Sequence, residues 1–333
     1  MAQAPVRFAI LGFGHHAIRR LVPAFRQCTQ ATLVGLWRRD AAAAAANAAE
    51  FGIPHVFATR EALCASPEVD AVFITSPDAM HLDDLQLAVA SGKAVLCEKP
   101  VAMNATDAAA MVTAAQRARM LYGVGQNFRY NRSLVWLQQQ IAAGNIGEPQ
   151  LAHAQFTYPA ASSQRRWIMD PGLACGGPLA DVGVHCVDAL RFVTGREVSS
   201  VSTLARTDAI SSAVDAVASL QLEMTGGIFA DVTVSGRSPY RTLVEVVGSE
   251  GVLIAENGLT VDRPVELVRR RAGDVMETVT VDNADGYTLM LDSFARAMHG
   301  TEVFAASGED AVANMRVLDA AMRSWKTGQR ERV

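Results

Sequence analysis

The segment 176–188 places a carboxylate and an imidazole four residues apart, at Asp181 and His185. Glycines and a proline come first, and an apolar pattern then continues to about Val193, which predicts a helix. In a helix this spacing puts both side chains on one face. Gly183 lies between them and costs roughly 1 kcal/mol of helix propensity relative to alanine, so we expect another group to approach it closely.

A lysine supplies a third group for the same chemistry. Lys99 follows the apolar run Ala94–Cys97 in the sequence Glu98-Lys99-Pro100. The proline keeps Lys99 out of the helical backbone region and permits a cis bond, so we expect the ammonium to be aimed at a site. Oxidation of a secondary alcohol needs a base near neutral pH, for which histidine is the usual choice. A carboxylate can orient the imidazole or bond substrate hydroxyls, and a lysine can polarise the reacting oxygen.

Each of these three residues also has an ordinary structural explanation. His185 alone would be a core or surface histidine, Asp181 a helix cap, and Lys99 a solvated surface lysine. They act as a catalytic set only if the fold brings them together.

The N-terminal segment has the pattern of a site for the hydride carrier. Val6–Leu11 predicts a buried strand, and Gly12-x-Gly14 follows it directly. Gly12 permits a tight turn, and Gly14 lets the backbone approach a pyrophosphate at a helix N-terminus. Ala17 takes the place of the third glycine. The alternative is a glycine-containing turn of any α/β domain. The apolar stripe of the predicted helix lies at Ile18, Leu21, Val22 and Phe25.

The residues after the second apolar run, Ala31–Trp37, bear on the choice of cofactor. Arg38 and Arg39 suit the 2′-phosphate of NADP, so they favour NADP(H). Asp40 can instead serve the ribose of NAD(H), and the two arginines can also be a solvated pair that opens a helix.

Strand–helix alternation to about residue 126 predicts an α/β fold with a doubly wound parallel sheet. Beyond it, short glycine-bearing turns join strand-like runs, which predicts a mostly antiparallel sheet. We therefore expect a dinucleotide-binding domain at 1–126 and a substrate-binding and oligomerisation domain at 127–333, whose C-terminal helix can pack back on the first. Helices are expected near 287–299 and 309–327. The strand-like runs are Gln150–Tyr158, Val198–Arg206, Ala216–Met224, Gly227–Val234, Thr242–Val247, Val252–Glu256 and Val265–Arg270.

Composition limits the class of protein. A chain of 333 residues with 50% hydrophobic and 19% charged residues predicts a globular protein of two domains. A net charge of −4 without a basic block argues against nucleic acid as a partner. The five scattered cysteines lack zinc spacing, so we expect no metal and reduced thiols in a cytoplasmic protein. We see no signal peptide and no membrane-spanning run.

In combination these motifs resemble the Gfo/Idh/MocA oxidoreductases, the family of glucose–fructose oxidoreductase and inositol dehydrogenase. The matching parts are Gly12-x-Gly14, Ser76-Pro77-Asp78-x-x-His81 beside the family's T-P-N-x-x-H loop, Glu98-Lys99-Pro100, and Gly176-Gly177-x-Leu179-x-Asp181-x-Gly183-x-His185, in the family's order. Asp78 replaces the commoner asparagine and puts a negative charge near the cofactor.

The resemblance implies an N-terminal Rossmann domain, a C-terminal α/β domain with a large antiparallel sheet, and an active site between them. It implies that Lys99, Asp181 and His185 are catalytic and that the Lys99–Pro100 bond is cis. Family members commonly form homodimers or homotetramers through the open face of the C-terminal sheet. The arginine after the second strand resembles the NADP-preferring members.

We predict two sets of binding residues. Asparagine and tyrosine suit hydroxyl-rich ligands, and tryptophan suits the apolar face of a sugar ring; surface polarity and sheet packing explain such residues equally well. The cofactor set is Gly12, Phe13, Gly14, His15, His16, Arg38, Arg39, Ser76, Pro77, His81, Glu98, Lys99 and Asn127. The substrate set is Lys99, Arg129, Tyr158, Arg166, Trp167, Asp181 and His185, with Tyr130 beside them.

The expected activity is hydride transfer between a nicotinamide cofactor and a secondary hydroxyl or carbonyl group. The resemblance implies that the substrate is a sugar, cyclitol or related polyol. One alternative is a redox-assisted glycosidase with tightly held NAD. Another is a non-catalytic dinucleotide-binding regulatory protein, which would be expected to lose the lysine, aspartate and histidine that this chain keeps.

Overall fold

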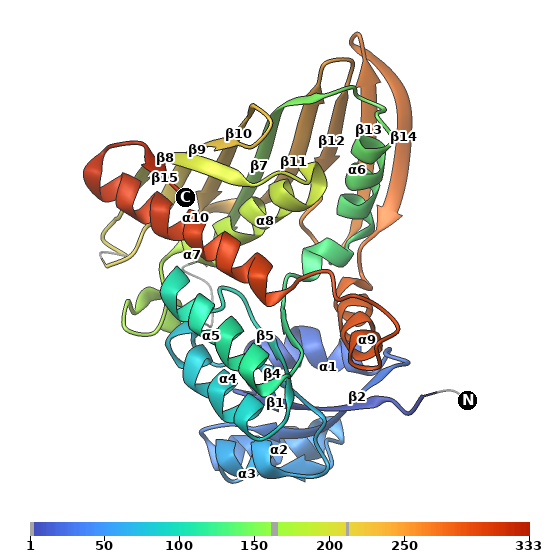
Figure 1. Ribbon diagram of the computed structural model, residues 1–333, viewed down its shortest axis with the longest axis vertical. Coiled ribbons are helices and arrows are strands. Elements are labelled where there is room, and N and C mark those ends of the chain that lie inside the picture. Colours follow the sequence, from blue (N-terminus) through green and yellow to red (C-terminus); the bar gives the residue numbers. More distant parts are fainter. Residues whose placement is uncertain (1–2, 161–165, 211–212) are drawn as a thin grey trace. The chain divides into compact units, whose positions relative to one another are not determined.

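The computed structural model describes residues 3–160, 166–210 and 213–333, and the chain divides into two compact units. The first unit comprises Met1–Gly125 and Tyr287–Val312, and the second comprises Gln126–Gly286 and Ala313–Val333. Each unit is built on a sheet of its own (Figure 1).

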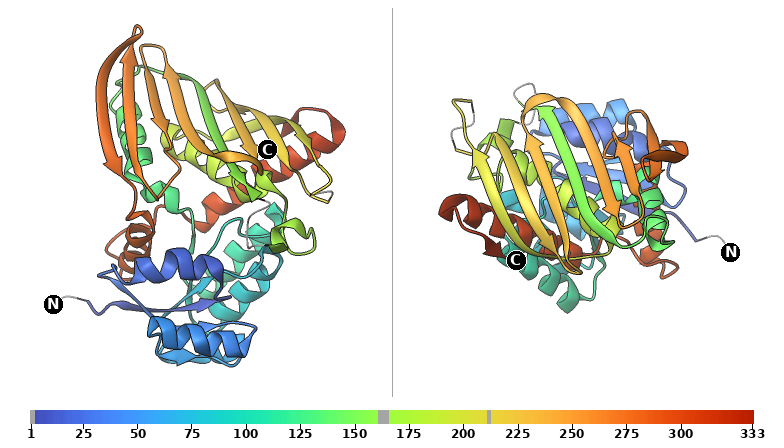
Figure 2. Two further views of the ribbon diagram at one scale, coloured as in Figure 1. Left: turned by 180° about the vertical axis from the view of Figure 1, so that it is seen from behind. Right: turned by 90° about the horizontal axis from the view of Figure 1, so that it is seen from above.

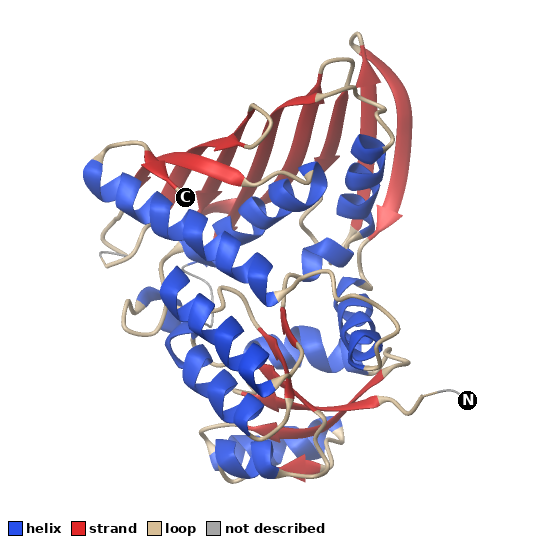
Figure 3. Ribbon diagram, viewed as in Figure 1, coloured by secondary structure: helices blue, strands red, loops and turns tan. Residues whose placement is uncertain are grey.

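The first unit contains a six-stranded sheet in the order β3-β2-β1-β4-β5-β6, with every pairing parallel. All residues of β4 and β5 are buried, because helices lie on both faces of the sheet (Figure 3). The strand order reverses between β1 and β4, the place where doubly wound sheets bind ligands. The predicted α/β class is therefore confirmed. The strands are β1 (Val6–Leu11), β2 (Ala31–Trp37), β3 (His55–Val56), β4 (Ala71–Ile74), β5 (Ala94–Cys97) and β6 (Tyr122–Val124).

Local sequence signals explain where the helices of this unit begin and end. Asp40, Thr59 and Asn104 each cap a helix, because their side chains accept a hydrogen bond from a backbone N–H three residues further on. Gly52 ends α2 in the left-handed conformation, with φ of +70°. The helices are α1 (Val22–Phe25), α2 (Ala41–Phe51), α3 (Arg60–Ala65), α4 (His81–Ala90), α5 (Ala105–Ala118) and α9 (Gly286–Met298).

The helix after the glycine turn differs from the regular α-helix that its apolar stripe predicts. Ala17–Leu21 forms a π-helical turn, η1, before α1 continues. Pro23 lies in this stretch and has no N–H with which to donate the α-helical hydrogen bond to the preceding turn. Leu21, Val22 and Phe25 are nevertheless buried. The wider turn changes the local backbone and keeps the apolar face toward the core.

The second unit contains a nine-stranded sheet in the order β14-β13-β12-β11-β7-β10-β9-β8-β15. Only β7 and β10 pair in parallel, and every other pairing is antiparallel, as the sequence predicts. Burial alternates along β9 and β10, because one face packs on helices and the other is open. The strands are β7 (Pro149–Pro159), β8 (Val198–Arg206), β9 (Val217–Met224), β10 (Ile228–Ser235), β11 (Arg237–Gly248), β12 (Val252–Glu256), β13 (Pro264–Arg271), β14 (Asp274–Asp282) and β15 (Glu331–Arg332).

Helices cover one face of this sheet. The helix α8 (Gly183–Thr194) packs against β7, β10 and β11, and α6 (Arg132–Ala142) packs against β12 and β14. The helix α10 (Gly308–Thr327) lies on β8, where Ser324 Oγ accepts a hydrogen bond of 2.9 Å from the backbone N–H of Thr203. Figure 2 shows the opposite face, over which none of the described helices lies.

The strand β14 is missing from the sequence-based expectation. Its residues alternate between exposed and half-buried, and Asp274, Glu277 and Asp282 are charged. An edge strand of this kind lacks the buried apolar face that marks a strand in a sequence. The two-residue strands β3 and β15 are too short to give a pattern.

The two predicted C-terminal helices are present as α9 and α10. Within the first unit, Asp292 of α9 accepts hydrogen bonds from the backbone N–H groups of Thr29 at 3.1 Å and Gln30 at 2.9 Å. This carboxylate ties α9 to the segment that leads into β2. None of the helices formed by the described residues is long and apolar enough to cross a membrane.

Candidate active site

The turn after β1 has the geometry of a dinucleotide-binding loop. Gly12 has φ of +94°, and a Cβ added there would lie 2.6 Å from the backbone nitrogen of Ser76. Only glycine lets this turn approach the loop after β4 so closely. At Gly14 the nearest described atom to an added Cβ is the Gly12 carbonyl oxygen, at 3.7 Å. The space beside Gly14, at the start of a helix, fits the pyrophosphate of a dinucleotide.

Glu98 links this loop to the segment that carries Lys99. Its Oε1 lies 3.0 Å from Nε2 of His16, and its Oε2 accepts a hydrogen bond of 3.2 Å from the backbone N–H of Lys99. Burial opposes ionisation of Glu98, but His16 and Lys99 outweigh burial and lower the pKa of the carboxyl group. The imidazole of His16 also packs edge-on against Tyr287. The Lys99–Pro100 bond is cis, as the resemblance implies.

The loop after β4 is held from two sides. Ser76 Oγ donates a hydrogen bond of 2.6 Å to Asp84, which also pairs with Arg60 at 2.5 Å. Burial raises the pKa of Asp84, although Ser76 and Arg60 oppose the rise. The ring of His81 lies between two backbone segments, with Nε2 at 2.7 Å from the Ser76 carbonyl oxygen and Nδ1 at 3.2 Å from that of Pro100. His81 thus connects the loops that follow β4 and β5.

The remaining predicted cofactor residues of the first unit differ in exposure. Arg38 is half-buried at the end of β2 and donates a hydrogen bond of 2.8 Å to Asn47. Arg39 is exposed. Phe13 is buried against Phe51, His15 is exposed and Pro77 is half-buried.

Asp181 and His185 do not lie on one continuous helix, which corrects the expectation from their spacing. The short helix α7 (Pro178–Asp181) ends at Asp181, Val182 interrupts the helix, and α8 begins at Gly183. The expected close approach to Gly183 is also absent among the described residues. An added Cβ would meet Leu179 at 3.5 Å, which is ordinary contact.

Asp181 is almost completely buried and is oriented by a neighbour on β7. The hydroxyl group of Tyr158 donates a hydrogen bond of 2.6 Å to its Oδ2. The start of α7 is fixed by Asp215, whose carboxylate accepts from the backbone N–H groups of Gly177 at 2.8 Å and Leu179 at 2.7 Å. Burial raises the pKa of Asp215, although these two hydrogen bonds oppose the rise. A Cβ added at Gly177 would lie 2.0 Å from the Asp215 carbonyl oxygen, so this approach requires glycine.

The contacts of His185 within the second unit include a hydrogen bond and two aromatic rings. Its Nδ1 lies 3.0 Å from Oε1 of Gln126, and its ring centre lies 4.5 Å from that of Phe128 and 6.3 Å from that of Phe156. The ring of Phe156 also packs edge-on against Tyr158. Within the second unit, His185 and the tyrosine that orients Asp181 therefore pack around the same phenylalanine.

The other predicted substrate residues have diverse surroundings. Arg129 forms a buried two-point ion pair with Asp188, at 2.8 and 2.7 Å, and its guanidinium lies 5.5 Å from the ring centre of Phe192. Asn127 is buried, and its amide nitrogen has no hydrogen-bond partner among the residues that the structure describes. Trp167 and Tyr130 are half-buried, and the side chain of Arg166 lies outside the described part of the structure.

Sequence reasoning did not select Gln126, Asp215 or Asp84. Gln126 lies next to the selected Asn127, but its partner is 59 residues away in the chain. Asp215 is 36 residues from Leu179. No spacing rule links such pairs, so only the fold reveals them.

Fold and turn together define a dinucleotide-binding protein of the Rossmann class. Residues 6–126 match the family described as "Oxidoreductase family, NAD-binding Rossmann fold", and residues 134–254 match the "GFO/IDH/MocA C-terminal domain". The chain belongs to the Gfo/Idh/MocA oxidoreductase family, which confirms the resemblance found in its motifs.

Relatives match over nearly the whole chain. The protein is 30% identical to 1,5-anhydro-D-fructose reductase of Ensifer adhaerens over 97% of both chains. It is 31% identical to D-xylose 1-dehydrogenase (NADP(+)) 2 of Haloferax volcanii, over 96% of this chain and 98% of that one. The crystal structure of aldose-aldose oxidoreductase from Caulobacter crescentus, complexed with glycerol, has the same fold, with a TM-score of 0.90 at 22% identity over 99% of this chain and 100% of that one. The protein is therefore an NAD(P)-dependent dehydrogenase or reductase.

Proposed function

We propose that this enzyme moves a hydride between a nicotinamide and a secondary hydroxyl or carbonyl group of a sugar or polyol. The substrate class follows from the names of the two relatives, which act on anhydrofructose and xylose. The single observation that carries the chemistry is the setting of His185. Its ring is buried between two aromatic side chains and is oriented at Nδ1, as a general base must be.

In this mechanism Lys99, Asp181 and His185 divide the work. A nicotinamide cofactor held at the glycine turn after β1 would supply the hydride chemistry in either direction. His185 takes the hydroxyl proton at Nε2 and gives it back in the reverse direction. Lys99 stabilises negative charge on the reacting oxygen. Asp181, oriented by Tyr158, accepts hydrogen bonds from substrate hydroxyl groups.

Substitution of the lysine and the histidine tests this assignment. We expect Lys99→Met and His185→Ala each to lower kcat/KM at least about 100-fold, because each removes a group that acts on the transition state. In His185→Ala the Kd for cofactor should stay within about twofold of the native value, because His185 lies outside the predicted cofactor set. The readout is NADPH absorbance with a panel of sugars and polyols, and the exposed His55→Ala serves as control. Native turnover in either variant would refute the assignment.

We also propose that the preferred cofactor is NADP(H). Arg38 directly follows β2, and a guanidinium at this position suits a 2′-phosphate. Asp40 caps α2 by accepting a hydrogen bond of 3.0 Å from the backbone N–H of Ala43, which orients its carboxylate toward the helix. NAD(H) remains the alternative that the experiment distinguishes.

A titration of tryptophan fluorescence compares the two cofactors. We expect NADPH to bind the native protein more tightly than NADH, and Arg38→Ala to reduce the difference at least about tenfold, the size of a lost charge-assisted hydrogen bond. Arg117→Ala, on the exposed face of α5, should leave both affinities unchanged. Tighter binding of NADH by the native protein would refute the proposal.

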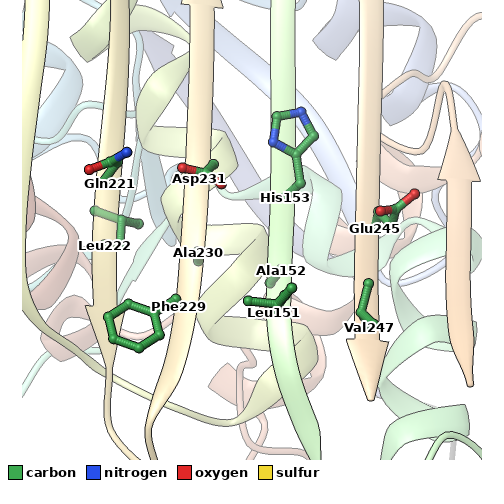
Figure 4. Close-up of a pocket in the computed structure, with 10 residues that line it drawn as sticks. All are labelled: Leu151, Ala152, His153, Gln221, Leu222, Phe229, Ala230, Asp231, Glu245 and Val247. Atoms are coloured by element: carbon green, nitrogen blue, oxygen red, sulfur yellow. The ribbon is translucent and has the colours of Figure 1, made fainter. Parts of the chain in front are cut away.

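We propose that the open face of the nine-stranded sheet pairs two copies of the chain. It exposes Leu151 and Phe229, at 52% and 60% of their surface. Both residues help to line a hollow across four adjacent strands, β9, β10, β7 and β11 (Figure 4). Asp231, His153 and Glu245 form a row across it. Apolar side chains beside polar groups that can donate and accept hydrogen bonds suit a self-complementary contact in a homodimer or homotetramer.

The buried thiols fit a reducing compartment. Cys64, Cys97 and Cys186 are buried, and burial raises the pKa of the Cys64 thiol to about 12. Proteins that keep buried cysteines as thiols are typical of the cytoplasm, and we place the enzyme there. Recovery of all five thiols on titration of the denatured protein, purified without reductant, would support this location.

A further inference from the structure

We infer that Gln126 is a positioning residue that selects the protonated nitrogen of His185. The inference rests on the proposed function, in which His185 is the base. It goes beyond that function, because it concerns a side chain outside the lysine, aspartate and histidine set. It predicts that the tautomer of the imidazole is set by one neutral amide.

The hydrogen bond between Gln126 and His185 determines which nitrogen of the ring carries the proton. Gln126 is 2% exposed, and its carbonyl oxygen Oε1 lies 3.0 Å from Nδ1 of His185. An amide oxygen can only accept a hydrogen bond, so Nδ1 carries the proton and donates it. In the neutral ring the lone pair then lies on Nε2. This is the tautomer that a base acting through Nε2 needs.

The aromatic packing around the ring cannot select between protonation at Nδ1 and at Nε2. Phe128 and Phe156 flank the imidazole, with ring centres 4.5 and 6.3 Å away. These contacts restrict the plane of the ring, but a hydrocarbon face does not distinguish a nitrogen with a proton from one without. Gln126 supplies the distinction that Phe128 and Phe156 lack.

The amide of Gln126, which positions the ring, carries no charge. A carboxylate in the place of Gln126 would stabilise the imidazolium and raise the pKa of His185. An amide is neutral, so it orients the ring without favouring the charged form of the imidazole. The ionisable groups on the surrounding elements, among the described residues, include Asp181 on α7, Tyr158 on β7, Cys186 and Arg191 on α8, and Arg129 of the helical turn Asn127–Tyr130, which pairs with Asp188 of α8. In the proposed function, the carboxylate of Asp181 is the charged group that accepts hydrogen bonds from substrate hydroxyls.

Two variants of Gln126 and one matched control test the inference. Gln126→Met keeps the length of the side chain and removes the acceptor. Gln126→Glu keeps the acceptor and adds a charge. The control is Gln138→Met on α6, a half-buried glutamine of the same unit, whose amide donates to the carbonyl oxygen of Phe192 at 3.3 Å.

The primary readout is the 15N NMR spectrum of the histidine rings, with His185 assigned by its loss in His185→Ala. In the native protein and in Gln138→Met we expect a protonated Nδ1 and an unprotonated Nε2. In Gln126→Met we expect a mixture of tautomers. A native ring with its proton on Nε2, or a Gln126→Met ring that keeps the native tautomer, would overturn the inference.

The pH profile of kcat/KM for alcohol oxidation gives a second readout. In Gln126→Glu the acid limb should move up by about one pH unit or more, because the new carboxylate stabilises the imidazolium. In Gln126→Met kcat should fall at least about tenfold, short of the roughly 10⁴-fold loss that a wrong tautomer causes in a serine-protease triad. The Kd for NADPH should be unchanged in both.

The two readouts separate this inference from the proposed function. If His185→Ala keeps native turnover, the proposed function fails, while the NMR spectra still decide what Gln126 does to the ring. If Gln126→Met does not fold, the 15N spectrum of the native protein and the pH profile of Gln126→Glu test whether Gln126 sets the tautomer. An unmoved acid limb in Gln126→Glu, in an enzyme that His185→Ala inactivates, would overturn the inference.

Discussion

Gly12 and Gly14 are two residues apart, but the structure tolerates an alanine only at Gly14. An alanine at Gly12 would combine φ of +94° with a Cβ 2.6 Å from backbone, so Gly12→Ala should lower the free energy of unfolding by more than about 1 kcal/mol. An alanine at Gly14 meets nothing described closer than 3.7 Å, so Gly14→Ala should leave that free energy within about 0.5 kcal/mol. Its methyl group would occupy the space for the pyrophosphate and raise the Kd for NADPH at least about tenfold. Urea unfolding and fluorescence titration measure both effects, and native NADPH affinity in Gly14→Ala would contradict the cofactor site.

Glu98 gives the first unit a stability that depends on pH. Burial alone would raise its pKa, but His16 and Lys99 lower the pKa below the ordinary value of 4.5. Ionised Glu98 therefore stabilises the folded state above about pH 4.5, and the contribution is lost as the pH falls through the lower folded-state pKa.

We expect Glu98→Gln to remove this part of the pH dependence. Between about pH 6 and pH 3 the variant should lose less stability than the native protein, although it starts from a lower value. Urea unfolding across a pH series measures the slope, with the exposed Glu50→Gln as control. Parallel loss of stability in Glu98→Gln and the native protein would show that Glu98 is not ionised in the way described.

At the scale of elements, the open face of the second sheet makes a prediction about assembly. Phe229 on β10 is 60% exposed on that face, and Phe229→Asp would place a charge in the proposed contact. We expect light scattering to show a dimer or tetramer for the native protein and a monomer for Phe229→Asp. Val303→Asp, at an 89% exposed residue of the first unit, should keep the native assembly. A monomeric native protein at micromolar concentration would contradict the proposed contact.

The elements that the sequence predicts best have a strong burial pattern. The expected strands at Ala94–Cys97, Val198–Arg206 and Val252–Glu256 coincide with β5, β8 and β12. Their apolar residues are continuous where both faces are covered and alternate where one face is open. The charged edge strand β14, the π-helical turn at Ala17–Leu21 and the break at Val182 have no such pattern, because tertiary contacts determine them.

The candidate site divides in the same way. Motifs select Lys99, Asp181 and His185, because a glycine turn and the start of a helix each have a recognisable local sequence pattern. Gln126 and Asp215 act through partners far away in the chain, so sequence reasoning cannot select them. Their roles depend on which loops the sheet brings side by side.

At the scale of the whole molecule, the proposed reaction needs residues from both units. Lys99 belongs to the first unit, and Asp181 and His185 belong to the second. In this reaction the ammonium and the imidazole must stabilise one transition state. When residues act as a unit in catalysis, the effects of their substitutions on the activation free energy do not add. The effects of substituting independent residues do add.

A double-mutant cycle of Lys99→Met and His185→Ala on kcat/KM tests this requirement most directly. We expect each single variant to lose at least about 100-fold, and the double variant to be no more than about tenfold slower than the slower single variant. A loss in the double variant equal to the product of the two single losses would mean that the two residues act separately, which would contradict the proposed reaction.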